Sequence, residues 1–389
     1  MQIDMKILLI SGNANDIFIT NMTKWLKASM PNVEIDIFSF FLNNSQYPNK
    51  YYDNQGYVNT NIWHQKIPIF RTIVYPYYYS KELKRFLQGK YYDIIQCHWI
   101  TPPLVLTRNL KKYCNKLFAT FWGGELEQLS ILYSQKIYKK YLDIFLEEVD
   151  YIINSKTFKN KLMSLWPQYA HKHIEGTLGS SPLEELYKLI ESESKEESKI
   201  KMSIDTNKLV VLIGYSAKTI HQHLPIIKEL AKREDMKSKL HLLAPMTRGN
   251  GKNYVDEVQS ALEQSGYTFT LLRDRFLSDV EVARLRNVTD ITLQLSTFDG
   301  FSRSIIECLC AKSVLIYGDW LSYEDSMKNA GFTGYNVPDI KTSVEKLVEI
   351  SNDIRKYDEE TIQNSLNGKK KNLWSECIKD WVNAYISAI

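Results

Sequence analysis

Short apolar runs rich in β-branched residues alternate with amphipathic stretches along the chain. Apolar runs without polar alternation are typical of parallel strands buried on both faces, and stripes at helical spacing are typical of helices packed on such a sheet. The repetition predicts a doubly wound α/β fold. In the first half the predicted strands are Lys6–Ile10, Val33–Phe38, Tyr92–Gln96, Lys116–Phe121 and Asp150–Asn154, and predicted helices include Lys81–Leu87 and Glu127–Glu148.

The alternation starts again after a charged run, Ile190–Asn207, which is poor in apolar residues and predicts the end of a surface helix followed by a linker. We therefore expect two Rossmann-like domains, residues 1–190 and 206–372, that face each other across a cleft. A last helix, residues 373–389, is expected to pack back on the first domain. The predicted second-half strands are Leu209–Ile213, Leu240–Ala244, Thr268–Leu272, Asp290–Leu295 and Ser313–Tyr317, and the helices include His221–Lys232, Tyr254–Ser265, Asp279–Arg286 and Phe301–Ala311.

Length and composition agree with this organisation. The chain has 389 residues, which is long for one hydrophobic core, and its 44% hydrophobic and 24% charged residues are ordinary for a globular protein. No apolar run reaches the ~18 residues of a membrane span, and the first residues do not resemble a signal peptide. We expect a cytoplasmic protein. Its cysteines fit no zinc spacing and are expected to be reduced core residues: Cys97, Cys114, Cys308, Cys310 and Cys377.

Charge is distributed unevenly between the two halves. Residues 1–180 carry 21 Lys and Arg against 14 Asp and Glu, a net charge of +7, whereas residues 181–389 carry 28 against 31, a net charge of −3. A basic first half suits an anionic partner, such as peripheral contact with the inner membrane surface, although a Lys-rich solvated surface is an equal alternative. No basic stripe or stacking motif indicates a nucleic acid partner.

Two acids, Asp299 and Glu307, flank the start of a predicted helix that follows a strand. Gly300 would permit a tight turn, and the amides of Phe301 and Ser302 would lie at the helix N-terminus, where a phosphate is favoured. A carboxylate at Glu307, about two turns along, could accept hydrogen bonds from sugar hydroxyls. The alternative is a capping acid followed by an unrelated glutamate.

This acid pair, with Gly300-Phe301 directly after the first acid, resembles the Glu-x7-Glu signature of retaining GT-B glycosyltransferases of the family 4 type. The resemblance implies that Asp299 and the amides of Gly300, Phe301 and Ser302 hold the donor sugar and diphosphate, and that Glu307 binds the ribose. It also implies a nucleotide-diphosphate sugar as co-substrate, with no cofactor and no metal. Asp299 stands where the family has Glu and is one methylene shorter.

The loop that opens the second domain offers further donor-binding candidates. The family usually places an Arg after the glycine, but here Tyr215 follows Gly214, and Lys218 could supply the charge instead. The spacing of Gly214, Ser216 and His223 is also similar to that of fucosamine transferases that act on lipid-linked intermediates, which are inverting GT-B enzymes. The alternatives are an ordinary strand-to-helix turn and, for His223, a structural histidine.

A glycine-rich loop, Pro245–Gly251, follows the next predicted strand. Its Arg248 could bind a diphosphate through two parallel hydrogen bonds. The alternative is an exposed arginine in a turn. We therefore count Arg248 among the donor-binding candidates.

The first domain supplies the acceptor-side candidates. Residues 119–125 end a strand and resemble a segment found at the cleft in many GT-B enzymes, in which Glu125 could bind hydroxyls or act as a catalytic base. Two adjacent glycines allow a ligand to approach closely. The alternative is a tight turn with a helix-capping acid. The acceptor-side candidates are Gly12, His98, Trp122, Gly123 and Gly124, and the catalytic candidates are Asp299, Glu307 and Glu125.

The sequence thus predicts a glycosyltransferase of the hexosyltransferase type that uses a nucleotide-diphosphate sugar. Retention of configuration, a glycan or lipid-linked acceptor and a role in bacterial surface polysaccharide synthesis are implied by the resemblance. Two alternatives stay open, an inverting lipid-linked amino-sugar transferase and a non-catalytic protein that binds a sugar nucleotide or a partner. A nicotinamide dehydrogenase needs Gly-x-Gly-x-x-Gly after the first strand, and residues 11–16 lack it.

Overall fold

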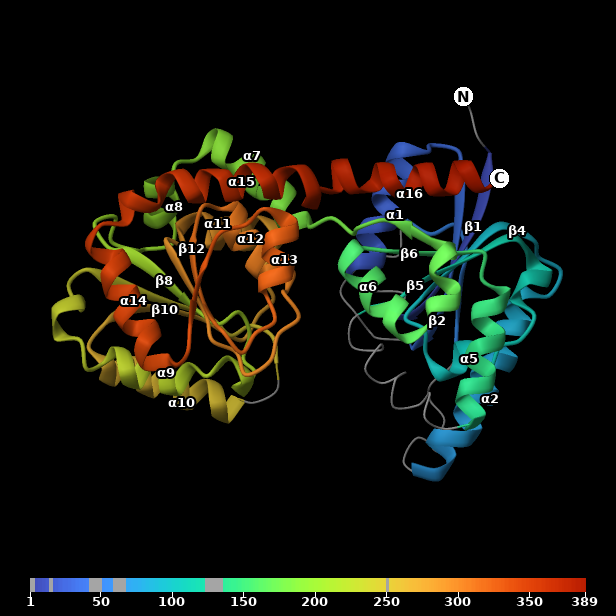
Figure 1. Cartoon of the computed structure of the whole chain (residues 1–389), viewed down its shortest axis with the longest axis horizontal. Coiled ribbons are helices and arrows are strands. Elements are labelled where there is room, and N and C mark those ends of the chain that lie inside the picture. The colour runs from blue at the N-terminus through green and yellow to red at the C-terminus, as the bar shows by residue number, and fades with distance from the viewer. Residues whose placement is uncertain (1–3, 14–16, 42–50, 59–67, 123–135, 250–251) are drawn as a thin grey trace. The chain divides into compact units, whose positions relative to one another are not determined.

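The computed structural model describes residues 4–13, 17–41, 51–58, 68–122, 136–249 and 252–389. The chain divides into two compact units, each an α/β sheet covered by helices (Figure 1). The first unit combines Met1–Gly179 with Trp374–Ile389, and the second is Ser180–Leu373. No helix in the described residues is long and apolar enough to cross a membrane.

Within the described residues, the first unit contains a seven-stranded parallel sheet of order β3-β2-β1-β4-β5-β6-β7. Its strands are β1 (Met5–Asn13), β2 (Val33–Phe41), β3 (Gln55–Tyr57), β4 (Tyr92–His98), β5 (Cys114–Thr120), β6 (Tyr151–Asn154) and β7 (His173–Glu175), and its helices are α1 (Ile17–Ser29), α2 (Pro68–Leu87), α3 (Pro102–Val105), α5 (Lys136–Glu148), α6 (Lys156–Leu165) and α16 (Trp374–Ala388). All five predicted strands are present, and the short strands β3 and β7 extend the sheet at its two edges. Consecutive residues 7–10 of β1 are fully buried because helices cover both faces.

Helix α16 completes the core of the first unit. Figure 1 shows it running beside α1. The two tryptophans Trp374 and Trp381, seven residues apart on one face, and Tyr385 are at most 1% exposed. Trp381 Nε1 donates to the Thr177 carbonyl at 3.0 Å, and the Tyr385 hydroxyl donates to Gln96 Oε1 at 3.2 Å. The last residues of the chain therefore bury their apolar face on strands formed near its beginning.

The second unit, as far as it is described, contains a six-stranded parallel sheet of order β10-β9-β8-β11-β12-β13. Its strands are β8 (Leu209–Ile213), β9 (Leu240–Pro245), β10 (Thr268–Leu272), β11 (Ile291–Gln294), β12 (Val314–Gly318) and β13 (Tyr335–Val337), and its helices are α7 (Ser181–Ser192), α8 (Lys195–Lys201), α9 (His223–Leu230), α10 (Lys252–Ser265), α11 (Asp279–Val288), α12 (Arg303–Cys310), α13 (Glu324–Ala330), α14 (Ile340–Asn352) and α15 (Asp358–Asn372). The five predicted strands are present, and β13 extends the sheet at one edge.

The segment Ile190–Asn207, expected to be a helix end plus a linker, contains the end of α7 and all of α8 and belongs to the second unit, so the boundary lies at residue 179 rather than 190. Ser194 begins α8 through a capping box with Glu197. The expectation rested on the density of charge, which is typical of solvated linkers.

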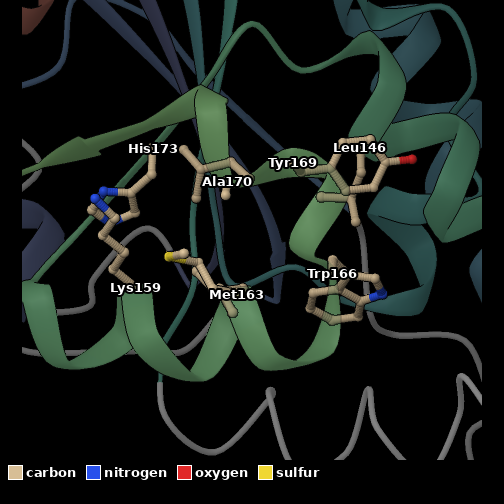
Figure 2. A pocket seen from close by; sticks show the side chains of 9 residues that line it. Leu146, Lys159, Met163, Trp166, Tyr169, Ala170 and His173 are labelled. Atoms are coloured by element: carbon tan, nitrogen blue, oxygen red, sulfur yellow. The ribbon is translucent and has the colours of Figure 1, made fainter.

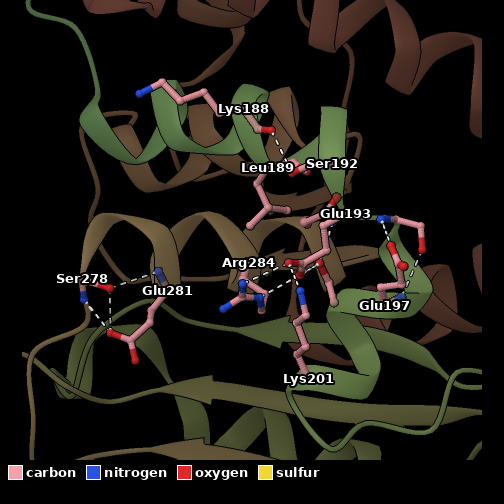
Figure 3. Close-up of polar contacts among 12 residues, drawn as sticks. Lys188, Leu189, Ser192, Glu193, Glu197, Lys201, Ser278, Glu281 and Arg284 are labelled. Atoms are coloured by element: carbon pink, nitrogen blue, oxygen red, sulfur yellow. Dashed lines mark hydrogen bonds and ion pairs between the residues drawn. The ribbon is translucent and has the colours of Figure 1, made fainter.

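These charges instead form ion pairs within the second unit (Figure 3). Glu193, between α7 and α8, is 7% exposed and accepts hydrogen bonds from Arg284 of α11 at 2.8 and 3.0 Å and from Lys201 at 2.6 Å. The pairing holds the pKa of Glu193 near 2, chiefly through Arg284. A buried, doubly paired carboxylate fixes the two helices to α11.

Both sheets have the doubly wound strand order, and in each the order reverses at one point. The reversal lies between β1 and β4 in the first sheet and between β8 and β11 in the second. Ligands of such sheets bind beyond the carboxyl ends of the strands at this switch point. The loops after β8 and β11 are therefore where the second unit is expected to bind a ligand.

Candidate functional site

Three loops at the carboxyl edge of the second sheet are joined by hydrogen bonds. The Ala217 amide donates to the Arg248 carbonyl at 2.6 Å, which links the loops after β8 and β9. The Thr297 amide donates to the Ile220 carbonyl at 2.8 Å, which links the loops after β8 and β11. These two hydrogen bonds join the three loops beside the switch point, and we call the joined loops the hydrogen-bonded surface.

A buried histidine forms hydrogen bonds with two of these loops. His221 is 1% exposed, and its Nε2 and Nδ1 lie 2.8 Å from Ser216 Oγ and 2.7 Å from Ser296 Oγ. Burial lowers the pKa of His221 to about 4, so the ring is neutral at pH 7. We expected the Ser216 hydroxyl to bind the donor. In the structure it is buried and forms a hydrogen bond with His221 that holds the loop together.

Gly214 and His223 are packed against each other beneath the same loop. Gly214 has a φ of +66°, and a Cβ there would lie 2.6 Å from His223 Nε2. His223 is fully buried, its Nδ1 lies 3.1 Å from the Tyr254 hydroxyl, and burial lowers its pKa to about 3. In place of the expected donor contact, His223 is a neutral side chain under the loop, and only glycine fits above it.

Asp299 lies at the start of α12 and is held by three donors. The Tyr215 and Tyr323 hydroxyls donate to its two oxygens, and the Ser302 amide donates to Oδ2 at 3.0 Å. Burial and the Asp299 carboxylate raise the pKa of both phenols, which remain protonated. Because a carboxylate already accepts from the Ser302 amide, that amide, a predicted phosphate donor, is engaged within the unit.

The turn before α12 differs from the expected geometry at its second and third residues. Phe301, not Gly300, has the left-handed conformation, with a φ of +61°. A Cβ at Gly300 would meet no atom within 4 Å, so glycine is not required there by packing. A left-handed conformation costs a bulky residue on the order of 1–2 kcal/mol. The Phe301 ring packs edge-to-face on Tyr323, with centroids 4.9 Å apart, and this contact helps to hold the strained turn.

Glu307 lies in the interior of the second unit. It is 6% exposed and accepts from Ser180 Oγ at 2.6 Å and from Arg286 Nε and Nη2 at 3.2 Å each. Binding a ribose, the role that the resemblance implies, would require breaking this buried pair. The geometry instead gives Glu307 a structural role, in which it joins α12 to α11 and to the start of the unit.

Two exposed cations stand on the hydrogen-bonded surface. Lys218 follows β8 and Arg248 follows β9, and neither forms an ion pair with a described residue. The Arg248 guanidinium lies 5.7 Å from the ring centroid of Phe276, whose side chain is 59% exposed. We call Lys218 and Arg248 the cation pair. Exposed cations on joined loops beside a switch point are suited to binding an anion.

The acceptor-side candidates of the first unit lie at the carboxyl edge of its sheet. Gly12 ends β1, and its carbonyl accepts from Ser39 Oγ at 3.2 Å. Trp122 stacks on Trp99, with ring centroids 4.9 Å apart and planes 4° from parallel.

His98 is fully buried, and burial lowers its pKa to about 3, so it does not present a basic nitrogen to solvent. Gly123, Gly124 and Glu125 lie outside the described residues.

The first unit also contains a small apolar pocket between α5, α6 and β7 (Figure 2). Its volume is about 10 Å³, room for one water molecule at most. Figure 2 shows Met163 of α6 and Trp166, directly after α6, facing it, with Lys159 and His173 at one end. The pocket is too small to hold a ligand.

The described residues contain no group of three or more His, Cys, Asp and Glu suited to a metal, and all five cysteines are buried.

The fold can be compared with known proteins. No model of a known protein family matches the chain, and no curated protein matches it. Among solved structures it is similar to a glycosyltransferase from Rickettsia africae (13% identity, 99% of each chain, TM-score 0.69) and a sucrose-phosphate synthase from Thermosynechococcus elongatus (12%, 98% of each chain, 0.73). It is also similar to Anabaena HepE in complex with UDP and glucose (13%, 99% of this chain and all of that one, 0.63).

These similarities extend over both units and establish the fold. The chain has the two-domain α/β architecture known as GT-B, as its sequence predicted. At 12–13% identity the comparison assigns no residue a role. The site therefore has to be argued from its own geometry.

Sequence reasoning missed the residues that organise the site. Tyr215 was noted as a mismatch to arginine, yet its hydroxyl binds Asp299, and Tyr323 binds the same carboxylate. His221 and Ser296 join loops 75 residues apart. Strand ends were the available signal, since Tyr215 lies two residues after a predicted strand and Ser296 one residue after another.

Proposed function

We propose that this chain is a glycosyltransferase that transfers a sugar from a nucleotide-diphosphate sugar to a saccharide acceptor. The observation that carries the proposal is the cation pair, two exposed charges on hydrogen-bonded loops, one after β8 at the switch point and one after the neighbouring strand β9. The GT-B fold supports it, because the similar structures include proteins described as glycosyltransferases and one bound to UDP and glucose. The donor diphosphate would bind at Lys218 and Arg248.

The proposed chemistry depends on stabilising the leaving diphosphate. Negative charge grows on the phosphate oxygens as the bond to the sugar breaks, and fixed cations lower the free energy of that state. Lys218 and Arg248 would supply these charges, and the amides of Gly300 and Phe301 would complete the cradle. Asp299 would act on the site indirectly, because its bonds to Tyr215 and Tyr323 hold the turn in place.

The acceptor is proposed to bind at the carboxyl edge of the first sheet. The stacked pair Trp99 and Trp122 offers an aromatic surface there, and Trp99 has a left-handed φ of +60°, a strain that is often found at functional sites. The excess of positive charge in residues 1–180 supports an anionic partner, such as a lipid-linked saccharide at the cytoplasmic face of a membrane. A role in surface polysaccharide synthesis follows from this choice of acceptor.

Calorimetric titration with UDP-, GDP- and dTDP-sugars tests the donor site. We expect one nucleotide class to bind, and Lys218→Ala and Arg248→Ala each to weaken its Kd roughly 10-fold, because each removes a charged hydrogen bond. Lys232→Ala is the matched control, since Lys232 is an exposed lysine that pairs with Glu229. Equal loss in all three variants, or no loss in any, would rule out the cation pair as the donor site.

Retention of configuration is the proposed stereochemical outcome, on the resemblance of the sequence around Asp299 to the retaining GT-B signature alone, since the structure pairs Glu307 with Arg286. Proton NMR of the initial product reports its anomeric configuration directly. An inverted product would favour the inverting lipid-linked transferase. Binding of a sugar nucleotide without transfer or hydrolysis would favour the non-catalytic alternative.

A further inference from the structure

An open groove lies at the carboxyl ends of β11, β12 and β13 in the second unit. We call it the Trp320 groove. Its volume is about 620 Å³, within the range of small-molecule sites. Lining residues follow four strands of the sheet: Gln222, Thr297, Trp320, Pro338, Asp339, Ile340 and Lys341.

Trp320 forms a fixed aromatic surface in this groove. Its Nε1 donates to the Ser296 carbonyl at 2.7 Å, so the indole reaches from the end of β12 to the end of β11. A Cβ at Gly318 would lie 2.3–2.5 Å from three carbons of the six-membered ring, which means that the ring lies directly against the glycine. The side chain nevertheless remains 39% exposed. A large ring held in place while exposed binds a ligand at a low cost in conformational entropy.

The remaining lining is polar and nearly neutral. Asp339 caps α14 by accepting from the Thr342 amide at 2.7 Å, and its carboxylate is exposed to the groove. Lys341, also exposed, lies 3.9 Å from Glu345 in a loose ion pair. The Gln222 amide nitrogen donates to the Leu295 carbonyl, and its oxygen remains an acceptor. One acid, one base and neutral donors and acceptors suit an uncharged ligand with many hydroxyls better than a phosphate.

We propose that the Trp320 groove is a saccharide-binding site. The apolar face of a sugar ring would stack on Trp320, and hydroxyls would bind Asp339, Lys341 and Gln222. Neither Lys218 nor Arg248 lines the groove, and Ser296 and Thr297 connect it to the loop after β8. The inference does not depend on donor binding or on transfer, because it concerns binding of a free glycan.

Saturation-transfer-difference NMR with uncharged disaccharides tests this site on the full chain. The probes are maltose, cellobiose, lactose and N,N′-diacetylchitobiose, each without nucleotide, and uridine and adenosine serve as nucleoside competitors. We expect at least one disaccharide to bind and its Kd to rise roughly 10-fold in Trp320→Ala, through loss of the stacking surface. Tyr91→Ala, which removes an exposed aromatic ring of the first unit, should bind normally.

Two further variants separate binding from folding. Asp339→Asn keeps a helix-capping side chain but removes the charge, so the fold should persist while binding weakens. Gly318→Ala adds a methyl group where the indole lies, and should displace the ring without altering its chemistry. Absence of disaccharide binding up to tens of millimolar would overturn the proposal. Binding that Trp320→Ala leaves unchanged, or that uridine or adenosine displaces, would also overturn it.

Discussion

Glu307 and Arg286 form an ion pair inside the second unit, where both side chains are at most 8% exposed. A charge buried in this way is stable only while its partner is present. The sequence spacing that makes Glu307 resemble a ribose-binding acid therefore coincides with a structural requirement. The residue holds α12, whose N-terminal turn carries Asp299, against α11.

Removing the Glu307 carboxylate should destabilise the second unit. We expect Glu307→Ala to lower the free energy of unfolding by about 3–5 kcal/mol, because Arg286 is left buried without its partner. Urea denaturation monitored by circular dichroism measures the change. Glu257→Ala, an exposed glutamate of α10, should shift it by less than about 0.5 kcal/mol. Full stability of Glu307→Ala together with loss of nucleotide binding would point instead to contact with the ribose.

Single residues also show where prediction from sequence fails. The loops after β8 and β11 could be identified as candidate sites, because strand ends are visible in the apolar pattern. Tyr215 and Asp299 are 84 residues apart, and no local pattern reports their hydrogen bond. The left-handed Phe301 is likewise set by its packing on Tyr323 rather than by its type.

At the scale of elements, helix α16 joins the end of the chain to its first unit. Trp374 and Trp381, seven residues apart on one face, are both buried in the core of that unit. The capping box of Ser194 and Glu197 is a local signal for the start of α8, but the burial of Glu193 could not be read from sequence, because its partner Arg284 lies 91 residues away. Edge strands β3, β7 and β13 have three residues each, too few for a recognisable pattern.

Truncating Trp381 tests the contribution of α16. Trp381→Ala should lower the free energy of unfolding of the first unit by about 3–5 kcal/mol, since it removes a fully buried indole and its bond to Thr177. Ile386→Ala, on the exposed side of the same helix, is the matched control. Equal effects of the two substitutions in urea denaturation would show that α16 does not pack as described.

At the scale of the whole molecule, the four histidines buried in the described part of the chain should make stability depend on pH. Burial lowers the pKa of His98 and His223 to about 3 and that of His221 and His241 to about 4, from an ordinary value of 6.5. Below pH 6.5 the unfolded chain takes up protons that the folded chain excludes. The free energy of unfolding should therefore be constant with respect to these groups above pH 6.5 and fall as pH decreases toward 4.

Denaturation at a series of pH values measures this dependence. Each excluded proton contributes a slope of about 1.4 kcal/mol per pH unit. His241→Leu should reduce the slope by one proton, because leucine takes up no proton in the unfolded chain. A slope unaffected by His241→Leu would mean that this histidine is protonated in the folded protein.

We propose above all that the carboxyl edge of the second sheet binds a nucleotide-diphosphate sugar and activates its sugar for transfer. Phosphorus NMR of the purified chain incubated with nucleotide-diphosphate sugars tests it most directly, because slow hydrolysis releases the nucleoside diphosphate even without an acceptor. We predict release from one donor class by the wild-type chain, and its loss in the double variant Lys218→Ala, Arg248→Ala. Equal release by the wild-type chain and the double variant, or no donor bound or consumed, would contradict the account.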